Sequence, residues 1–530
     1  MILTSAFVTG KSAAQHTPVV TTATLLLLGM ASFSAKADLT DLLNAGSLNG
    51  YNEIRRQSAI ANQAVYDQLK SGGCDDAQNT PTKGGFCDGS IYNVWRNVRE
   101  VVHNANVISN AINPNGLAKP TLYTLGRNVA QLGGALQWCN GEEFASLNSL
   151  STSFVASQAS SLASRITALR LGATELHASN FGLEDNQNLV RNNASAIGGG
   201  ASADSDDDYD YTNSPWSAWG LFGNGSYVKG QKIPTSAEEG FNYKGPSANL
   251  GIDKRLNQNW VIGGMVGYQK QKLDFTPFNN NLAVGSSDLK GISLMPYVLY
   301  ESDRWYMNLS VGYQHLNFDT NRLINYGTQP NTALPVTVVV SHQAGDPSKA
   351  TATSISSFDS LGFSMRPVAA WVIEPSISFD YQHISIGRFT EQDPNNQGFA
   401  FLVDSQTVNS LEGIPELRTQ YTFTPGFGVW TPYLDVQWHH QFNTNPRTIS
   451  ETYAGAENVL TQSARFNVKT DALDPWYQVY SAGISAVLRG SSAGATHNSG
   501  GFQMYLAYRK YEGLKNYDQK VYAAGFRYEF

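Results

Sequence analysis

The sequence predicts a transmembrane β-barrel of twelve antiparallel, up-and-down strands, preceded by a smaller α-helical exported region. Apolar and polar residues alternate along most of residues 216–530, in segments that are joined by short and long connections in alternation. Charged residues are only 15% of the chain, whereas Tyr and Gly are abundant at 26 and 48 residues. A length of 530 residues suggests more than one domain, and the net charge of −7 gives no reason to expect a nucleic-acid partner.

The C-terminal strand has the clearest alternation. Every second residue is apolar or aromatic, and the set is Tyr522, Ala524, Phe526, Tyr528 and Phe530. The residues between them are small or charged. A period of two places one face in lipid and the opposite face in a watery lumen.

The N-terminus has the features of a secretory signal peptide over residues 1–37. Lys11 supplies positive charge, residues 19–33 are mostly apolar, and Ala35-Lys36-Ala37 forms a cleavage site before Asp38. No later stretch approaches eighteen consecutive apolar residues. We therefore expect export through the Sec machinery and no helical membrane span.

Residues 38–180 are predicted to form a helical exported region, with apolar spacings of three and four at 51–69, 91–112 and 123–172. The apolar stripe at 154–169 favours packing in a helical bundle, although such a helix can also lie along another surface. Cys74 and Cys87 are candidates for a disulfide that would leave Cys139 over, but sequence does not determine the pairing.

Residues 181–215 are predicted to be a Gly- and Asp-rich linker. The run of carboxylates at 204–210 repels itself and includes little apolar surface to bury. Calcium binding is the alternative, but the run lacks EF-hand spacing or a nonapeptide repeat. No metal site is expected here.

The barrel domain, residues 216–530, divides into twelve two-period segments. We expect strands at 216–229, 245–256, 260–275, 287–302, 304–320, 352–367, 371–390, 411–425, 428–442, 476–489, 500–511 and 516–530. The second, fourth, sixth and eighth connections are tight, whereas 321–350 and 443–475 read as long polar loops. An even strand number places both ends of the barrel on the periplasmic side.

Six charged residues on these strands are predicted to face the lumen. They are Glu374, Asp380, Asp435, Arg509, Arg527 and Glu529. They could line a pore or grip a threaded segment, but we favour a solvated lumen in which they pair with one another. His439 and His440 cannot both face inward, because neighbouring strand residues point to opposite sides.

Several of these stretches resemble the translocator of autotransporters, the type V secretion family. The resemblance is carried by SAWGLFGNGSYVKG at 217–230, the strand pair at 247–268, WVIEPSISFDYQHISIGRFTE at 371–391, WTPYLDVQWHHQF at 430–442 and the terminal AAGFRYEF. It implies a barrel in outer-membrane lipid that is inserted by the barrel-assembly machinery. Tyr522, Phe526, Tyr528 and Phe530 resemble the signal that this machinery recognises.

The resemblance extends upstream to residues 133–173, which are similar to the helical segment before the barrel in a subgroup with short passengers. That similarity implies a chain that threads through the lumen to the surface. The long β-helical repeat passenger of large autotransporters is missing from this sequence.

Enzymatic activity is not expected. Residues 38–215 contain neither G-x-S-x-G nor G-D-S-x, and only His103 and His177 could act as a base there. H-E-x-x-H and P-loop patterns are absent, so no cofactor is expected. The Asn192-Asn193 pair lies where some family members cleave their passenger, but the flanking residues do not match.

The expected function is export or display of the protein's own N-terminal segment from the bacterial outer membrane. Two alternatives stay open. One is a porin-like channel with a periplasmic or plugging helical domain, and the other is a surface adhesin that uses the long outer loops. The helical region would lie at the cell surface if it is displayed, whereas it could lie in the periplasm if the barrel is a porin-like channel. The sequence does not identify a surface ligand.

Overall fold

The structure of the protein is a computed structural model. It describes residues 39–44, 46, 50–75, 83–112, 129–176, 219–257, 259–276, 285–302, 304–326, 342–425, 428–488 and 502–529. The predicted signal peptide at 1–37, the predicted linker at 181–215 and Phe530 lie outside these residues.

The helices precede the barrel in the chain. They are α1 (Leu39–Asn44), α2 (Glu53–Ser71), α3 (Gly89–Ile112), α4 (Val129–Trp138), the 3-10 turn η1 (Glu142–Phe144) and α5 (Ala145–Leu176). The Asn52 side chain caps α2 by accepting a hydrogen bond from the backbone N–H of Arg55 at 3.0 Å. Within the helical region predicted for 123–172, η1 separates α4 from α5. None of the helices that the structure describes is long and apolar enough to cross a membrane.

The barrel is closed and has twelve staves, which confirms the predicted fold class and strand number. The staves are β1 (Trp219–Lys232), β2 (Phe241–Arg255), β3 (Trp260–Phe275), β4 (Gly285–Glu301), β5 (Trp305–Tyr326), β6 (His342–Phe363) continued by β7 (Met365–Val368), β8 (Trp371–Ile386), β11 (Gln406–Tyr421), β12 (Gly428–Gln441), β15 (Trp476–Leu488), β16 (Phe502–Glu512) and β17 (Tyr517–Glu529). β1 pairs with β17 from Gly220↔Glu529 to Lys232↔Tyr517. This seam joins the first and last staves, so the described strands form a wall without a free sheet edge.

Burial along the strands follows the alternation read from the sequence. On β5, Leu309, Val311 and Tyr313 are exposed on the outer wall, whereas Asn308 and Gln314 are buried inside. The same pattern recurs around the barrel, with large apolar residues exposed on the outside and polar residues buried on the inside. An apolar outer surface and a polar interior suit a barrel embedded in lipid.

Two segments predicted as long loops contain ordered strands instead. β5 and β6 continue as paired strands from Asn321↔Pro347 to Tyr326↔His342, so the described parts of this segment, 321–326 and 342–350, are strand. A second sheet of four short strands, β9 (Phe389–Thr390), β10 (Phe401–Val403), β13 (Thr448–Tyr453) and β14 (Phe466–Lys469), uses residues of the connections after β8 and β12. We call this sheet the loop platform. Its strands are too short for a period-two alternation to be recognised in the sequence, and the strands that they pair with are distant along the chain.

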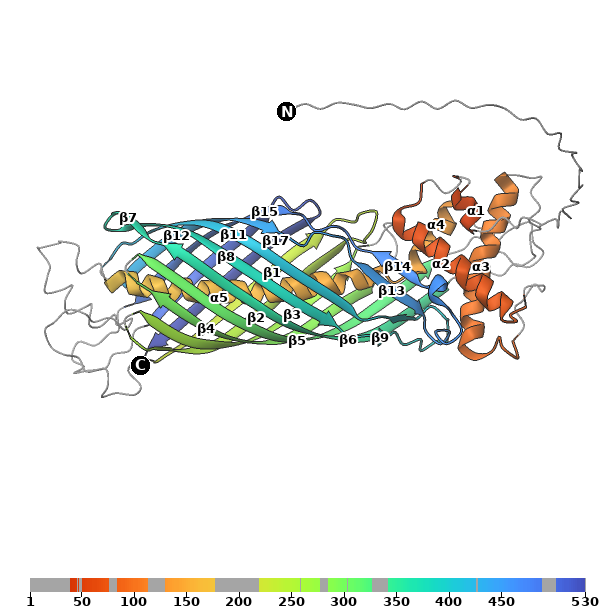
Figure 1. The fold of residues 1–530 in the computed structure, drawn as a ribbon, viewed down its shortest axis with the longest axis horizontal. Helices are drawn as coiled ribbons and strands as arrows, with labels where there is room; N and C mark the ends of the chain where they lie inside the picture. The colour runs from red at the N-terminus through yellow and green to blue at the C-terminus, as the bar shows by residue number, and fades with distance from the viewer. Residues whose placement is uncertain are drawn as a thin grey trace, which may run out of the picture.

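The helices α1–α4, which we call the helical module, cover one end of the barrel (Figure 1). The C-terminus lies at the opposite end, where β1 also begins. We call the module's end the outer end and the other the inner end. The buried apolar residues of the module form one cluster with those of the loop platform and the barrel mouth, including Trp95, Phe144, Phe401 and Phe318. The module is therefore packed on the barrel rather than tethered to it.

We predict that Gly245→Ala will destabilise the barrel by about 1–3 kcal/mol, because overpacking at a close contact forces the backbone apart. A Cβ atom at Gly245 would lie 1.9 Å from the carbonyl oxygen of Lys270 on β3. Gly264→Ala is the matched control, since a Cβ atom there has no heavy atom within 4 Å. Urea unfolding of the refolded protein, followed by Trp fluorescence, measures the difference. Equal unfolding midpoints for the two variants would contradict the prediction.

Candidate functional site

The lumen is occupied lengthwise by α5 (Figure 1). At 32 residues and about 1.5 Å per residue, the helix measures roughly 48 Å, longer than the hydrocarbon core of a bilayer. It runs from η1 at the outer end to the inner end where β1 begins. The bundle predicted for residues 154–169 is therefore wrong. The helix has polar and small residues on most of its circumference, and the lumen wall that surrounds it is polar as well.

Arg165 anchors α5 to the barrel wall near the seam. Its Nε donates to Asp253 on β2 at 3.0 Å, and the Tyr297 hydroxyl donates to the same carboxylate at 3.0 Å. Asp253 is only 1% exposed, and Arg165 is also buried. A buried pair of this kind fixes position, because moving either partner leaves an uncompensated charge.

Arg170 makes a second anchor one and a half turns further along α5. Its guanidinium pairs with Glu374 on β8, and its Nη2 donates to the Ser364 hydroxyl at 3.2 Å. Ser364 in turn donates to Glu374 at 2.6 Å. The guanidinium carbon also lies 3.3 Å from the centre of the Tyr306 ring, which adds a cation–π contact.

Hydrogen bonds to Gln158 and Ser161, which precede the first anchor, and to Thr167, between the two anchors, add to these contacts. Gln158 Oε1 accepts from Ser293 on β4 at 2.8 Å, and the Ser161 hydroxyl accepts from Asn249 on β2 at 3.1 Å. Arg418 on β11 donates to Thr167 at 2.5 Å. At least five staves, β2, β4, β5, β8 and β11, therefore contact α5. The helix is thus part of the barrel interior.

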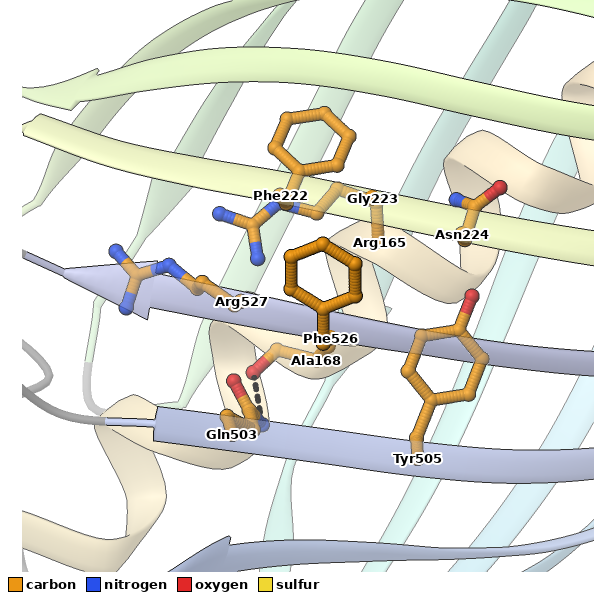
Figure 2. Close-up of a pocket in the computed structure, with 9 residues that line it drawn as sticks. All are labelled: Arg165, Ala168, Phe222, Gly223, Asn224, Gln503, Tyr505, Phe526 and Arg527. Carbon is orange, nitrogen blue, oxygen red and sulfur yellow. Dashed lines mark hydrogen bonds between the residues drawn. The ribbon is translucent and has the colours of Figure 1, made fainter. Parts of the chain in front are cut away.

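Figure 2 shows how closely α5 approaches the seam between β1 and β17. The Arg165 guanidinium carbon lies 4.4 Å from the centre of the Phe222 ring, and Gln503 on β16 donates to the carbonyl of Ala168 at 3.0 Å. The space among these side chains is only about 10 Å³, which is no more than a water-sized gap. The helix and the wall are packed at this level.

The structure places the six charged residues predicted to face the lumen as follows. Glu374 is buried against Arg170, and Asp435 lies 3.9 Å from Arg418. Arg509 donates to Ser164 of α5 at 2.9 Å, and Arg527 lies 3.6 Å from Asp253. Asp380 is buried beside Gln382. The side chain of Glu529 lies outside the described side chains.

Three of these residues, Glu374, Arg509 and Arg527, thus meet α5 or an ion-pair partner of α5, and Asp435 lies beside Arg418, which donates to Thr167 of α5. The preference for mutual pairing across a solvated lumen did not anticipate these contacts. Tyr522, Phe526 and Tyr528 are exposed on the outer wall of β17. Cys74 and Cys87 form a disulfide with Cα atoms 5.1 Å apart, and Cys139 is buried outside it.

Arg322 joins the helical module to the outer end of the barrel. It is 0% exposed and donates to Glu391 at 2.7 Å. The same guanidinium donates to the backbone carbonyls of Trp138, at 3.1 Å, and Phe399, at 2.7 Å. One side chain on β5 therefore holds the end of α4 and the loop platform together. Sequence reasoning missed it, because Arg322 falls in a segment predicted to be a loop.

Further bonds link the module to the loop platform directly. The Tyr453 hydroxyl donates to Asn62 at 2.8 Å, and the backbone N–H of Gly141 donates to Glu451 at 2.8 Å. Ser90 donates to the carbonyl of Gly455 at 2.9 Å. The module is thus fastened by polar contacts around a shared apolar core.

Buried carboxyl groups gather where the module meets the barrel. Burial raises the pKa of Glu239, in the β1–β2 connection, to about 7, while hydrogen bonds to Glu142 and Gln137 lower it in part. Burial and the charges of Glu239 and Glu143 raise the pKa of Glu142 well above its usual range. Burial likewise raises the pKa of Glu451 to about 8. Each of these shifts favours the neutral acid in the docked state.

The described part of the chain contains no group of three or more His, Cys, Asp or Glu residues that could hold a metal ion. His439 faces inward, and its Nδ1 lies 2.8 Å from a carboxylate oxygen of Glu412. His440 lies against Trp476, with the two ring centres 4.1 Å apart. His103 is buried, and its ring centre lies 6.2 Å from that of Tyr66. His177 lies outside the described residues.

Comparison with known proteins matches residues 221–498 to the autotransporter beta-domain family. Comparison with curated proteins gives no match. Among solved structures, the chain is similar to the translocator domain of autotransporter NalP from Neisseria meningitidis, with 12% identity, a TM-score of 0.41 and coverage of 60% of this chain and 90% of that one. It is also similar to the beta domain of the Bordetella autotransporter BrkA, with 15% identity, a TM-score of 0.35 and coverage of 59% and 100%. A third similar structure is the transport unit of AIDA-I from Escherichia coli, with 14% identity, a TM-score of 0.35 and coverage of 60% and 92%.

Arg165→Met should lower the free energy of unfolding by about 3–5 kcal/mol, because it leaves Asp253 charged and buried without its main partner. The double variant Arg165→Met/Asp253→Asn should lose less than the single variant, since it buries no uncompensated charge. Urea unfolding of both proteins in the same detergent checks this. A double variant that is less stable than the single one would contradict the ion-pair interpretation.

Docking of the helical module should weaken as the pH rises. Glu239 has an ordinary pKa of roughly 4.3 when unfolded and about 7 when docked. A carboxyl group whose pKa is raised in the docked state contributes stability that is fully present below its pKa in the unfolded state. That stability is lost as the pH rises through its pKa in the docked state. We expect roughly 2 kcal/mol less stability at pH 8 than at pH 5, measured by urea unfolding at 222 nm.

Glu239→Gln is the control for this pH dependence, because the amide stays neutral at every pH. It should retain more of its stability at pH 8 than the wild type does. Greater stability of the wild-type module at pH 8 than at pH 5 would show that the sign is wrong.

Proposed function

The chain belongs to the autotransporter beta-domain family, and from this premise we propose that it displays its own helical module at the bacterial cell surface. The barrel is an outer-membrane translocator of this family. The cargo in this proposal is the short segment that precedes the barrel, which α5 connects to the barrel through the lumen.

The path of α5 is the observation that carries the proposal. The helix joins the module at one end of the barrel to the end where β1 begins. Membrane barrels have tight turns on the periplasmic side and longer loops outside. Here β2 and β3 join through a turn at 256–259 and β4 and β5 through a turn at 302–304, whereas the connections at 387–405 and 442–475 lie at the module's end. This orientation supports a module that faces the exterior.

The contacts at the outer end favour display over release. The module shares its apolar core with the loop platform, and burying one Phe side chain contributes about 1.5–3 kcal/mol. Arg322 adds bonds from β5 to the carbonyls of Trp138 and Phe399. A segment meant for release would be expected to make few contacts with the barrel.

The two alternatives fit these observations less well. An open, porin-like channel would need α5 to leave a lumen in which Arg165 and Arg170 are buried in ion pairs. An adhesin that binds through the 443–475 connection would use a segment whose β13 and β14 already pack in the cluster shared with the module.

Surface labelling of intact cells tests the proposal. An epitope tag inserted at Asn115, between α3 and α4, should bind antibody on cells whose outer membrane is sealed. A tag in the β2–β3 turn at Asn257 is the matched control and should bind antibody only after the membrane is opened, because that turn lies at the inner end. Both variants need to retain the shift in gel mobility on heating that marks a folded barrel.

A tag at Asn115 that becomes accessible only after the membrane is opened would overturn the proposal. Tagged module recovered from the medium instead of the cells would show release in place of display. Accessibility of the Asn257 tag on sealed cells would show that the proposed orientation is inverted.

A further inference from the structure

The lumen is not filled evenly around α5. On one side, a cavity of about 220 Å³ lies between the helix and the wall formed by β8, β11, β12, β15 and β16. On the helix side its lining is small, with Ala156, Ala159 and Ala163 among the residues that face it. The lining also includes Leu473 and Leu514 from outer connections, so the cavity reaches the outer end.

Two carboxylates face each other across neighbouring strands in this cavity. Asp380 on β8 is opposite Glu412 on β11 in the strand register. Glu412 accepts from the Tyr477 hydroxyl at 2.8 Å and lies 2.8 Å from His439 Nδ1. Asp380, which is 6% exposed, meets only the Gln382 amide at 3.4 Å and makes no ion pair with any residue that the structure describes.

An unpartnered acceptor lies beside these carboxylates. Gln382 lines the same cavity and is 2% exposed, and its Oε1 has no hydrogen-bond partner among the described residues. Buried polar atoms are almost always hydrogen-bonded in native proteins, and leaving such a bond unmade is unfavourable. A donor that reaches both Gln382 and Asp380 would satisfy the two groups together.

The cations of the cavity do not supply that donor. Arg509 is hydrogen-bonded to Ser164 on α5, and Arg447 lies beyond the end of β12 in the outer connection. Asp474, the remaining acid of the lining, lies 3.7 Å from Lys515. His439 is shared with Glu412. The excess of acceptors is therefore concentrated at Asp380, Glu412 and Gln382.

We propose that this cavity binds an organic ammonium ion, with its charged nitrogen at Asp380 and Glu412 and its hydrocarbon part against α5. The Tyr477 ring stacks between His439, at 4.4 Å, and Tyr511, at 6.2 Å between ring centres, and this packing holds the Tyr477 hydroxyl on Glu412. An ammonium group donates several hydrogen bonds and accepts none, which matches a site of acceptors. The volume accommodates a short alkyl chain and is far larger than a bare metal ion needs.

Calorimetry with the full-length protein refolded in zwitterionic micelles tests the site. The probe is 1,4-diaminobutane at constant ionic strength, and the uncharged comparison is 1,4-butanediol. We expect saturable binding of the diamine and none of the diol. Asp380→Asn should weaken diamine binding about tenfold or more, because it replaces a charge-assisted bond with a neutral one.

Two further variants separate the site from general effects of charge and folding. Asp319→Asn also removes one negative charge, but its side chain is half exposed beside Lys290, 3.6 Å away, so binding should be unchanged. Ala156→Leu fills the cavity from α5 without altering any charge and should abolish binding. Failure to bind the diamine at millimolar concentration, equal binding of the diol, or wild-type affinity in folded Asp380→Asn would each overturn the proposal.

Discussion

Closure of the sheet between β1 and β17 is the constraint on which the rest of this structure depends. Hydrocarbon offers no hydrogen-bond partners, so an open edge inside the membrane would leave a row of backbone groups unsatisfied at several kcal/mol each. The register from Gly220↔Glu529 to Lys232↔Tyr517 removes that cost along the whole seam. It also converts the inner face of every strand into the wall of an enclosed space, which then has to be hydrated or filled.

This chain fills that space with α5. Ser, Ala and Gln side chains keep the helix narrow, and two arginines five residues apart direct charge to different walls. At 3.6 residues per turn, Arg165 and Arg170 point about 140° apart, which matches their partners Asp253 on β2 and Glu374 on β8. Buried ion pairs contribute little net stability compared with apolar packing, but they penalise every misplaced register strongly. Their role here is to set the depth and rotation of the helix in the lumen.

The connections at the outer end of the barrel hold the helical module in place. Connections that could have remained surface loops instead extend β5 and β6 and form the loop platform, and both contact the helical module. Arg322 and Glu451 reach the backbone between α4 and α5, so the point at which the chain leaves the lumen is held by the barrel itself. This arrangement links the position of α5 to the seating of the module. So small a helical module has a limited core of its own, and its packing on the mouth of the barrel adds to its stability.

The barrel, its twelve staves and the outward direction of side chains such as Leu309, Val311 and Tyr313 of β5 could be predicted from the amino-acid pattern alone. Those features are local, because the period of two and the tight turns at 256–259 and 302–304 are properties of neighbouring residues. It is the tertiary structure that places α5 in the lumen instead of a bundle, that extends β5 and β6 over 321–326 and 342–350, and that brings Arg322, Gln382 and Asp380 to the partners they have. Those outcomes join residues that are distant along the chain, such as Arg170 and Glu374, and an apolar stripe or an isolated arginine looks the same in sequence whichever surface it finally meets.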